Sequence, residues 1–115
     1  MDNLTEKERQ ALRELVEGLK ELYGDNLSRV ILYGSKARGD AGHDSDIDVL
    51  VVLKRMGLRY DEIDKITKIS APICLKNDLL ISIFPIEERW VNAEYKTIFL
   101  HNVLRDGVEL YDKKR

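Results

Sequence analysis

The sequence predicts an α/β (α+β) fold, a small mixed β-sheet of three to four strands with helices packed mainly on one side. Three observations predict it. Apolar residues after Thr5 recur at three- and four-residue spacing, which is the period of an α-helix. The runs 28–33 and 46–53 are rich in aliphatic residues and typical of buried strands. Helical and strand-like segments then alternate to the end, within a length that predicts a single domain, 1–115.

A helix is expected near the N-terminus. Thr5 and Glu8 have the spacing of a capping box, which marks a helix start, and Gly24 suits the position after the last helical turn. The apolar residues between them share one face, so we predict a packing helix. The segment 28–33 follows as a short strand, with Val30–Leu32 as its apolar centre.

A tight turn and a second strand come next. Gly34 allows a sharp turn that a side chain would obstruct, and the segment 35–38 is predicted to form one or two helical turns. The glycine-rich segment 39–42 then ends them. The run 46–53 is continuously aliphatic after its acidic start, so we expect a central strand buried on both faces.

The next segment is predicted to repeat the helix-to-strand order. A helix begins at Tyr60 and continues to about Ser70, and Pro72 should end or kink it. A third strand is expected over 79–84. Pro85 should close that strand, because proline has no N–H to give to a sheet.

The C-terminal part is predicted to hold a helical turn over 87–90, a helix over 95–105 and a short edge strand or extended tail over 108–111. Trp90 and Tyr95 are expected to pack in the core or at its edge rather than to form a platform on which bases stack. Should these two side chains be exposed, they would mark a partner surface.

The composition and charge indicate a globular protein and argue against membrane insertion and general nucleic-acid binding. A hydrophobic fraction of 43% with 35% charged residues is typical of a soluble globular protein. The sequence has no apolar run of membrane-spanning length and begins with polar and acidic residues, so we expect a cytoplasmic protein with no membrane contact. The formal net charge of −2 argues against general nucleic-acid binding. Cys74 stands alone, which excludes an internal disulfide.

Two aspartates and a Gly-Ser turn form the candidate site. Asp46 and Asp48 point to the same face at the start of one predicted strand, because alternate strand residues do. Aligned carboxylates repel unless a cation lies between them, and such oxygen ligands suit Mg²⁺ shared with substrate phosphates. Gly34 and Ser35 offer backbone N–H groups and a hydroxyl to a phosphate. The pattern predicts a metal–triphosphate site; the alternative for Gly34 and Ser35 is an ordinary strand-to-helix turn with its N-cap.

Two neighbouring residues are further candidates. Arg38 has the planar guanidinium that suits an anion, and the alternative is that it bonds backbone carbonyls or Asp40 and only shapes the loop. Ser45 is expected to cap the acidic loop through its hydroxyl and so to hold Asp46 in place.

The window 34–48 resembles the signature of the minimal nucleotidyltransferases, the small branch of the DNA polymerase beta-like nucleotidyltransferase superfamily: Gly34-Ser35-x-Ala37-Arg38-Gly39-x(5)-Ser45-Asp46-x-Asp48. Eight positions are fixed within fifteen residues, so a chance match is rare. The resemblance implies the nucleotidyltransferase fold. It also implies that Asp46 and Asp48 hold Mg²⁺ and that Gly34 and Ser35 hold the nucleotide phosphates.

Members of the superfamily use a third carboxylate, on the strand beside the Asp-x-Asp strand, as a general base or an additional metal ligand. The predicted strand 79–84 carries no acid. Asp78 precedes it and, by strand alternation, would share a face with Leu80 and Ser82. Asp78 is therefore the candidate third carboxylate, reaching the site from the strand's edge; the alternative is a residue of a helix-to-strand turn.

The resemblance also implies the activity. Such an enzyme transfers a nucleoside monophosphate, here expected to be AMP from ATP with Mg²⁺, to an acceptor. Stand-alone members pair with small helical HEPN proteins, and several such pairs are toxin–antitoxin systems in which the nucleotidyltransferase adenylylates the toxin. We expect a HEPN-type partner as the acceptor. The alternatives are an antitoxin that neutralises its partner by contact without catalysis, and adenylylation of an aminoglycoside-like small molecule in a pocket made by homo-oligomerisation.

Overall fold

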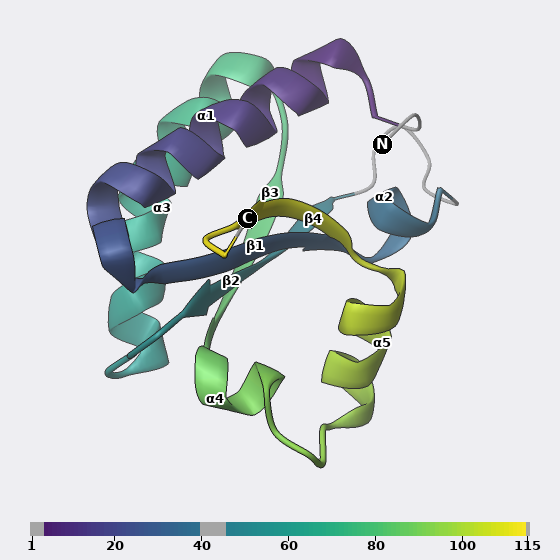
Figure 1. The fold of residues 1–115 in the computed structure, drawn as a ribbon. Helices are drawn as coiled ribbons and strands as arrows, with labels where there is room; N and C mark the ends of the chain where they lie inside the picture. The colour runs from purple at the N-terminus through teal and green to yellow at the C-terminus, as the bar shows by residue number, and fades with distance from the viewer. Residues whose placement is uncertain (1–3, 40–45, 115) are drawn as a thin grey trace.

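The computed structural model describes residues 4–39 and 46–114, which form one four-stranded mixed sheet with helices (Figure 1). The strand order is β3-β2-β1-β4; β2 and β3 are parallel, whereas β1 is antiparallel to both β2 and β4. This arrangement confirms the predicted fold class. In chain order the elements are α1 (Glu6–Tyr23), the 3-10 turn η1 (Gly24–Asn26), β1 (Leu27–Tyr33), α2 (Ser35–Arg38), β2 (Ile47–Leu53), α3 (Arg59–Asn77), β3 (Ile81–Glu87), α4 (Glu88–Val91), α5 (Ile98–Asp106) and β4 (Val108–Asp112).

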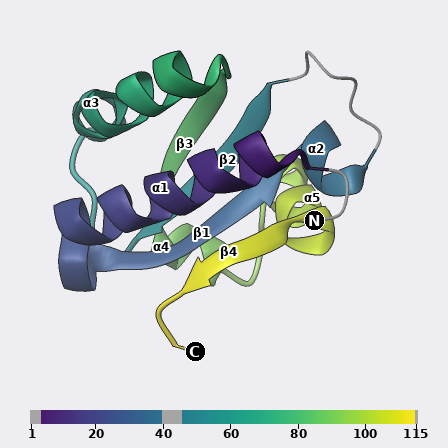
Figure 2. The same ribbon diagram turned by 90° about the horizontal axis from the view of Figure 1, so that it is seen from above.

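The two faces of the sheet are covered unequally. The long helices α1 and α3 contact each other over one face, where their apolar side chains complete the larger core (Figure 1 and Figure 2). The short helices α4 and α5 lie over the opposite face, and residues of both join a smaller core with Ile31, Leu50 and Val52 of the strands. The prediction of helices mainly on one side therefore holds for the two long helices.

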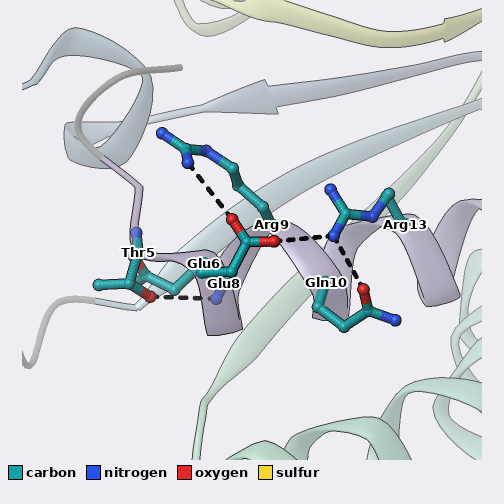
Figure 3. A network of polar contacts seen from close by, with 6 residues as sticks. All are labelled: Thr5, Glu6, Glu8, Arg9, Gln10 and Arg13. Carbon is teal, nitrogen blue, oxygen red and sulfur yellow. Dashed lines mark hydrogen bonds and ion pairs between the residues drawn. The ribbon is translucent and has the colours of Figure 1, made fainter.

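α1 begins and ends where the sequence predicted. The hydroxyl of Thr5 accepts a hydrogen bond from the N–H of Glu8 at 3.1 Å, and the Glu8 carboxylate accepts one from the N–H of Thr5 at 2.8 Å. This capping box is drawn in Figure 3, together with the ion pair of Glu6 and Arg9 on the outer side of the helix. Gly24 follows the last turn as the C-cap.

β2 is the central strand that the sequence predicted, and all its side chains except Asp48 are buried. Its register aligns Asp48 with Tyr33 on β1 and with Ser82 on β3. Within residues 4–39 and 46–114, no helix combines the length and the apolar content needed to cross a membrane.

α3 continues through Pro72 to Asn77. The prediction that the helix ends near Ser70 is therefore wrong. Pro72 itself is exposed, and the buried side of the helix continues on both sides of it with Ile66 and Ile73. Packing of this buried side offsets the backbone hydrogen bond that a proline removes from a helix.

β3 begins at Ile81 rather than at Leu79, and it continues through Pro85 to Glu87, so the prediction that Pro85 closes the strand is wrong. β3 lies at an edge of the sheet, where a proline need not supply an N–H to a second neighbouring strand. The sequence alone did not show that this strand is an edge.

The C-terminal helix starts later than predicted because Thr97 caps it. The Thr97 hydroxyl accepts a hydrogen bond from the N–H of Leu100 at 3.1 Å, so α5 begins at Ile98. β4 pairs with β1, which confirms the edge-strand alternative for this segment. Trp90 and Tyr95 are 51% and 88% exposed, so the expectation that they pack in the core or at its edge is wrong.

Candidate active site

Gly34 joins β1 to α2 and lies in contact with the side chain of Asp48. Its backbone has φ +77° and ψ −157°, a conformation that favours glycine. A Cβ built on Gly34 would overlap Oδ2 of Asp48 and would stand 3.3 Å from its Cγ. Glycine is therefore needed here both for the turn, as predicted, and for the approach of a carboxylate from the next strand, which the sequence did not reveal.

Asp46 and Asp48 lie close together at the start of β2. Asp48 is half-buried on the strand and Asp46 is exposed directly before it. Burial raises the pKa of Asp48 above its ordinary value, and the negative charge of Asp46 raises it further, whereas the positive charge of Arg38 lowers it. The structure thus brings the two predicted carboxylates and Arg38 within electrostatic reach of one another.

Tyr33 is a neighbour of the site that the sequence did not single out. It is the cross-strand partner of Asp48, and its ring contacts the ring of Phe99 on α5 edge-on, with 5.5 Å between ring centroids. Burial raises the pKa of the Tyr33 hydroxyl, and the charge of Asp48 raises it further. The pairing of β1 with β2 was predictable as a pattern, but its register was not.

Lys36 lies next to Ser35 on α2, yet its side chain turns away from the carboxylate pair. Its ammonium nitrogen is 2.7 Å from Oε2 of Glu8 on α1, and the two side chains are only 5% and 4% exposed. Burial would raise the pKa of Glu8, but the hydrogen bonds from Lys36 and Thr5 hold it below its ordinary value. This buried ion pair fixes α2, and with it the Gly-Ser turn, to the start of α1.

A pocket of about 250 Å³ lies between the turn and α5. Gly34 and Arg38 line one side of it, and Asn102 and Asp106 line the other. A hydrogen bond from Arg105 holds the pKa of Asp106 below its ordinary value, and the charge of Arg38 adds to this effect. Arg38 therefore lines a pocket beside the turn, and its two predicted roles, contact with an anion and shaping of the loop, stay predictions.

Asp78 lies at the end of α3, not on a strand. Its backbone is left-handed, with φ +53° and ψ +51°, and it forms the C-cap of the helix. It lines a groove between α3 and β3 together with Ile81 and Ile83, which belong to the larger core on the opposite face from Leu50. The inference that strand alternation places Asp78 on the face of Ser82 is therefore wrong, because β3 has not yet begun at this position.

The neighbour of Asp48 on β3 is Ser82, which is exposed. A hydroxyl thus occupies the strand position beside the carboxylate pair. Ser45, the predicted cap of the acidic loop, lies outside the described residues.

The donor set at the carboxylate pair fits a divalent cation. Among the residues that the structure describes, no three His, Cys, Asp or Glu side chains gather into a metal-binding group. A cation at Asp46 and Asp48 would therefore take its remaining oxygen ligands from phosphates and water, as Mg²⁺ commonly does. The unfavourable effect of Asp46 on the ionised form of Asp48 is the repulsion that such a cation would relieve.

Comparison with known sequences supports the resemblance. Residues 12–102 match the model of the nucleotidyltransferase domain family. A Methanocaldococcus jannaschii protein named "Putative protein adenylyltransferase" is 40% identical over 101 residues, which are 88% of this chain and 96% of the relative. A second protein of that organism with the same name is 33% identical over 104 residues, 90% of this chain and 98% of the relative.

Solved structures share the fold. A crystal structure of a "putative nucleotidyltransferase" from Sulfolobus solfataricus superposes with a TM-score of 0.61 at 22% identity, covering 96% of this chain and 87% of that one. A chain from the complex of tri-AMPylated Shewanella oneidensis HEPN toxin with MNT antitoxin superposes with a TM-score of 0.56 at 16% identity, covering 92% and 73%. The resemblance seen in the sequence is confirmed: the chain belongs to the nucleotidyltransferase domain family and has the predicted enzyme class.

Proposed function

We propose that the protein transfers AMP from ATP, with Mg²⁺, to a protein acceptor. The observation that carries the proposal is the carboxylate pair at the start of β2, with Asp48 packed against the Gly34 turn. The repulsion within the pair and the turn beside it are the features that a metal–triphosphate substrate would satisfy. The name of the Methanocaldococcus jannaschii relatives supports a protein as the acceptor and AMP as the group transferred.

Each residue of the site has a proposed task. Asp46 and Asp48 would hold Mg²⁺, which neutralises phosphate charge during an in-line displacement. Gly34, the N-cap of α2, has no side chain to cap the first turn, so we propose that the turn's backbone and the Ser35 hydroxyl would orient the leaving pyrophosphate. Arg38 would add positive charge beside the phosphates.

The reaction requires a proton acceptor. An oxygen of the acceptor forms a bond to the α-phosphorus, the bond from that phosphorus to the pyrophosphate oxygen breaks, and the acceptor oxygen loses its proton. Ser82 cannot serve as the base beside Asp48, because a hydroxyl does not take up a proton at neutral pH. Asp78 is the candidate base that the sequence offers. Its position at the end of α3, in a groove on the face of the sheet opposite the carboxylate pair, argues against this role.

The proposed acceptor is a small helical HEPN-type toxin in the cytoplasm, for which this protein would be the antitoxin. The fold shared with a chain of the complex of HEPN toxin and MNT antitoxin supports this assignment. A second candidate function is an antitoxin that acts by contact alone. The position beside Asp48 on β3 carries the hydroxyl of Ser82 and no carboxylate, which favours this candidate.

Transfer to a partner can be tested directly. The protein is incubated with its partner, labelled ATP and Mg²⁺, and the partner should gain the mass of AMP. Asp46→Asn should stop the labelling and leave the complex with the partner intact. Asp64→Asn, an exposed aspartate of α3, is the matched control and should label normally.

Two further variants separate the candidate functions. A severe loss of rate in Asp78→Asn would place that carboxylate at the reacting atoms, and an unchanged rate would exclude it as the base. The wild-type protein could bind the partner tightly without labelling it, and the double variant with Asp46→Asn and Asp48→Asn could neutralise the toxin equally well. These two results together would exclude AMP transfer and show that the protein is an antitoxin that acts by contact.

A further inference from the structure

We propose that the pocket between β3, α4 and α5 receives the nucleobase of the triphosphate, and that it favours purines by stacking. The proposal rests on the proposed function, because it concerns the nucleoside end of the same substrate. The pocket encloses about 300 Å³, near the lower end of the range for small-molecule sites. Its walls include four aromatic side chains: Phe84, Trp90, Tyr95 and Phe99.

Three of the aromatic side chains of this pocket are exposed, although the guanidinium of Arg89 lies over the Trp90 ring at 4.9 Å from its centroid. Trp90 and Tyr95 leave half or more of their surface to solvent. Phe99 is also partly exposed, and its ring centroid is 5.3 Å from that of Phe84. Exposed aromatic faces that line a concave surface are suited to stack on a planar ring, and the larger purine ring gains more contact than a pyrimidine.

The pocket shares a lining residue with the pocket at the phosphate turn. Phe99 lines both this pocket and the smaller one at Gly34 and Arg38. The same ring contacts Tyr33, the cross-strand partner of Asp48, and Phe84, so a row of aromatic rings joins the two pockets on the face of the sheet that carries the carboxylates. A triphosphate held at Gly34 would therefore have an aromatic surface leading away from it for its nucleoside.

Each of the three polar side chains that line this pocket, Arg59, Lys96 and Thr97, makes a hydrogen bond within the protein, which limits discrimination between bases. The guanidinium of Arg59 lies 4.8 Å from the Phe84 ring centroid and donates from Nε to the carbonyl of Pro85 at 2.9 Å. The hydroxyl of Thr97 accepts the N–H of Leu100. We therefore expect ATP and GTP to bind with similar affinity, and CTP and UTP to bind more weakly, because stacking senses ring size rather than hydrogen-bonding edges.

The position of Trp90 provides a direct probe. It is the single tryptophan of the chain, so its fluorescence reports on this pocket alone. With Mg²⁺ present, ATP should change the Trp90 emission, whereas inorganic triphosphate should bind and compete with ATP without changing it. The proposal would be overturned if ATP and inorganic triphosphate compete for binding but ATP does not change the Trp90 emission.

Variants then measure the contribution of the pocket by calorimetry. Tyr95→Ala and Phe99→Leu should weaken ATP binding by about 5- to 100-fold, the range measured for losing one base–aromatic stack, and should not alter triphosphate binding. Tyr95 is largely exposed, so its variant should fold even if the Phe99 variant does not. Tyr60→Ala, an exposed tyrosine at the start of α3 outside the pocket, is the matched control.

The outcomes separate the base pocket from the rest of the site. Unchanged ATP affinity in both variants, with lost labelling of the partner, would overturn the base pocket and assign this surface to the protein acceptor. An equal loss for ATP and triphosphate would also overturn it, because the residues would then only support the turn. If wild-type protein binds neither ligand and Asp46→Asn changes nothing, the proposed function fails together with the base pocket.

Discussion

The two faces of the sheet have the same alternating strands but different covers, and they hold charge in different ways. On the side of the larger core, Glu8 of α1 is buried, and Lys36 of α2 neutralises it at 2.7 Å. On the opposite face, the short helices leave Asp46 and Asp48 near the surface, where the charge of one opposes ionisation of the other. A buried charge is stable only when it is paired. Like charges at the surface are solvated by water, so they tolerate one another until a ligand binds and neutralises them.

This difference indicates how the protein combines stability with a site. The larger of the two cores lies under the long helices, so the other face need not be closed. Substitutions on the first face should change the free energy of unfolding, and substitutions at the carboxylate pair should change ligand binding. Four predictions test this separation, from the largest expected effect to the smallest.

The largest effect is expected when Lys36 is replaced. Lys36→Met leaves the Glu8 carboxylate buried without its partner, and loss of one member of a buried pair typically costs about 3–5 kcal/mol. Lys76→Met is the matched control, because Lys76 makes an ion pair of the same 2.7 Å length with Glu14 at the surface and should matter little. Urea denaturation measures both, and equal losses would show that burial does not distinguish the pairs. Adding Glu8→Gln to Lys36→Met should recover part of the stability.

A methyl group at the turn should affect both stability and binding. Gly34→Ala places a Cβ in an unfavourable backbone region, at a cost of about 1–3 kcal/mol, and drives it into the Asp48 carboxylate. We expect loss of Mg²⁺-dependent ATP binding along with lower stability. Gly57→Ala is the control, because a Cβ there meets no atom within 4 Å. Calorimetry with and without Mg²⁺ measures the binding, and normal ATP binding by Gly34→Ala would separate the turn from the site.

Protonation of Glu8 at acidic pH should lower the free energy of unfolding. Its pKa in the folded protein lies below the ordinary value of 4.5, so the unfolded chain binds more protons in the interval between the two values. The stabilisation from Glu8 is therefore complete above pH 4.5 and is lost as the pH falls through the lower, folded-state pKa. Glu8→Gln should flatten this part of the profile of unfolding free energy against pH. An identical profile in the variant would contradict the assignment.

The smallest effect on stability is expected at Ser35. Gly34, not Ser35, is the N-cap of α2, so Ser35→Ala should not remove a cap and should leave the melting temperature almost unchanged. A lost hydrogen bond to a charged phosphate is worth about 1.5–3 kcal/mol, so ATP binding should weaken by roughly 10- to 100-fold. A stability loss near the typical 1 kcal/mol of a helix cap, with unchanged affinity, would make the residue structural.

Much of the fold could be predicted because its signals are local. The capping box at Thr5 fixed the start of α1, and the aliphatic run after Asp48 identified the central strand β2. The motif from Gly34 to Asp48 indicated the site, since it contains both the Gly-Ser turn and the carboxylate pair in one short window. The predictions that Pro72 ends its helix and that Pro85 closes its strand were wrong. Packing of the helix and the edge position of the strand decide how much a proline destabilises each element.

The sequence by itself determined the order of elements, the turn at Gly34 and the alignment of Asp46 with Asp48, because helix caps, strand alternation and turn chemistry depend on neighbouring residues. Only the tertiary structure decided that Lys36 pairs with Glu8 and that Ser82 lies beside Asp48. It also decided which aromatic side chains remain exposed around the site. Register, edge position and burial arise from contacts between segments far apart in the chain, and no local pattern specifies them.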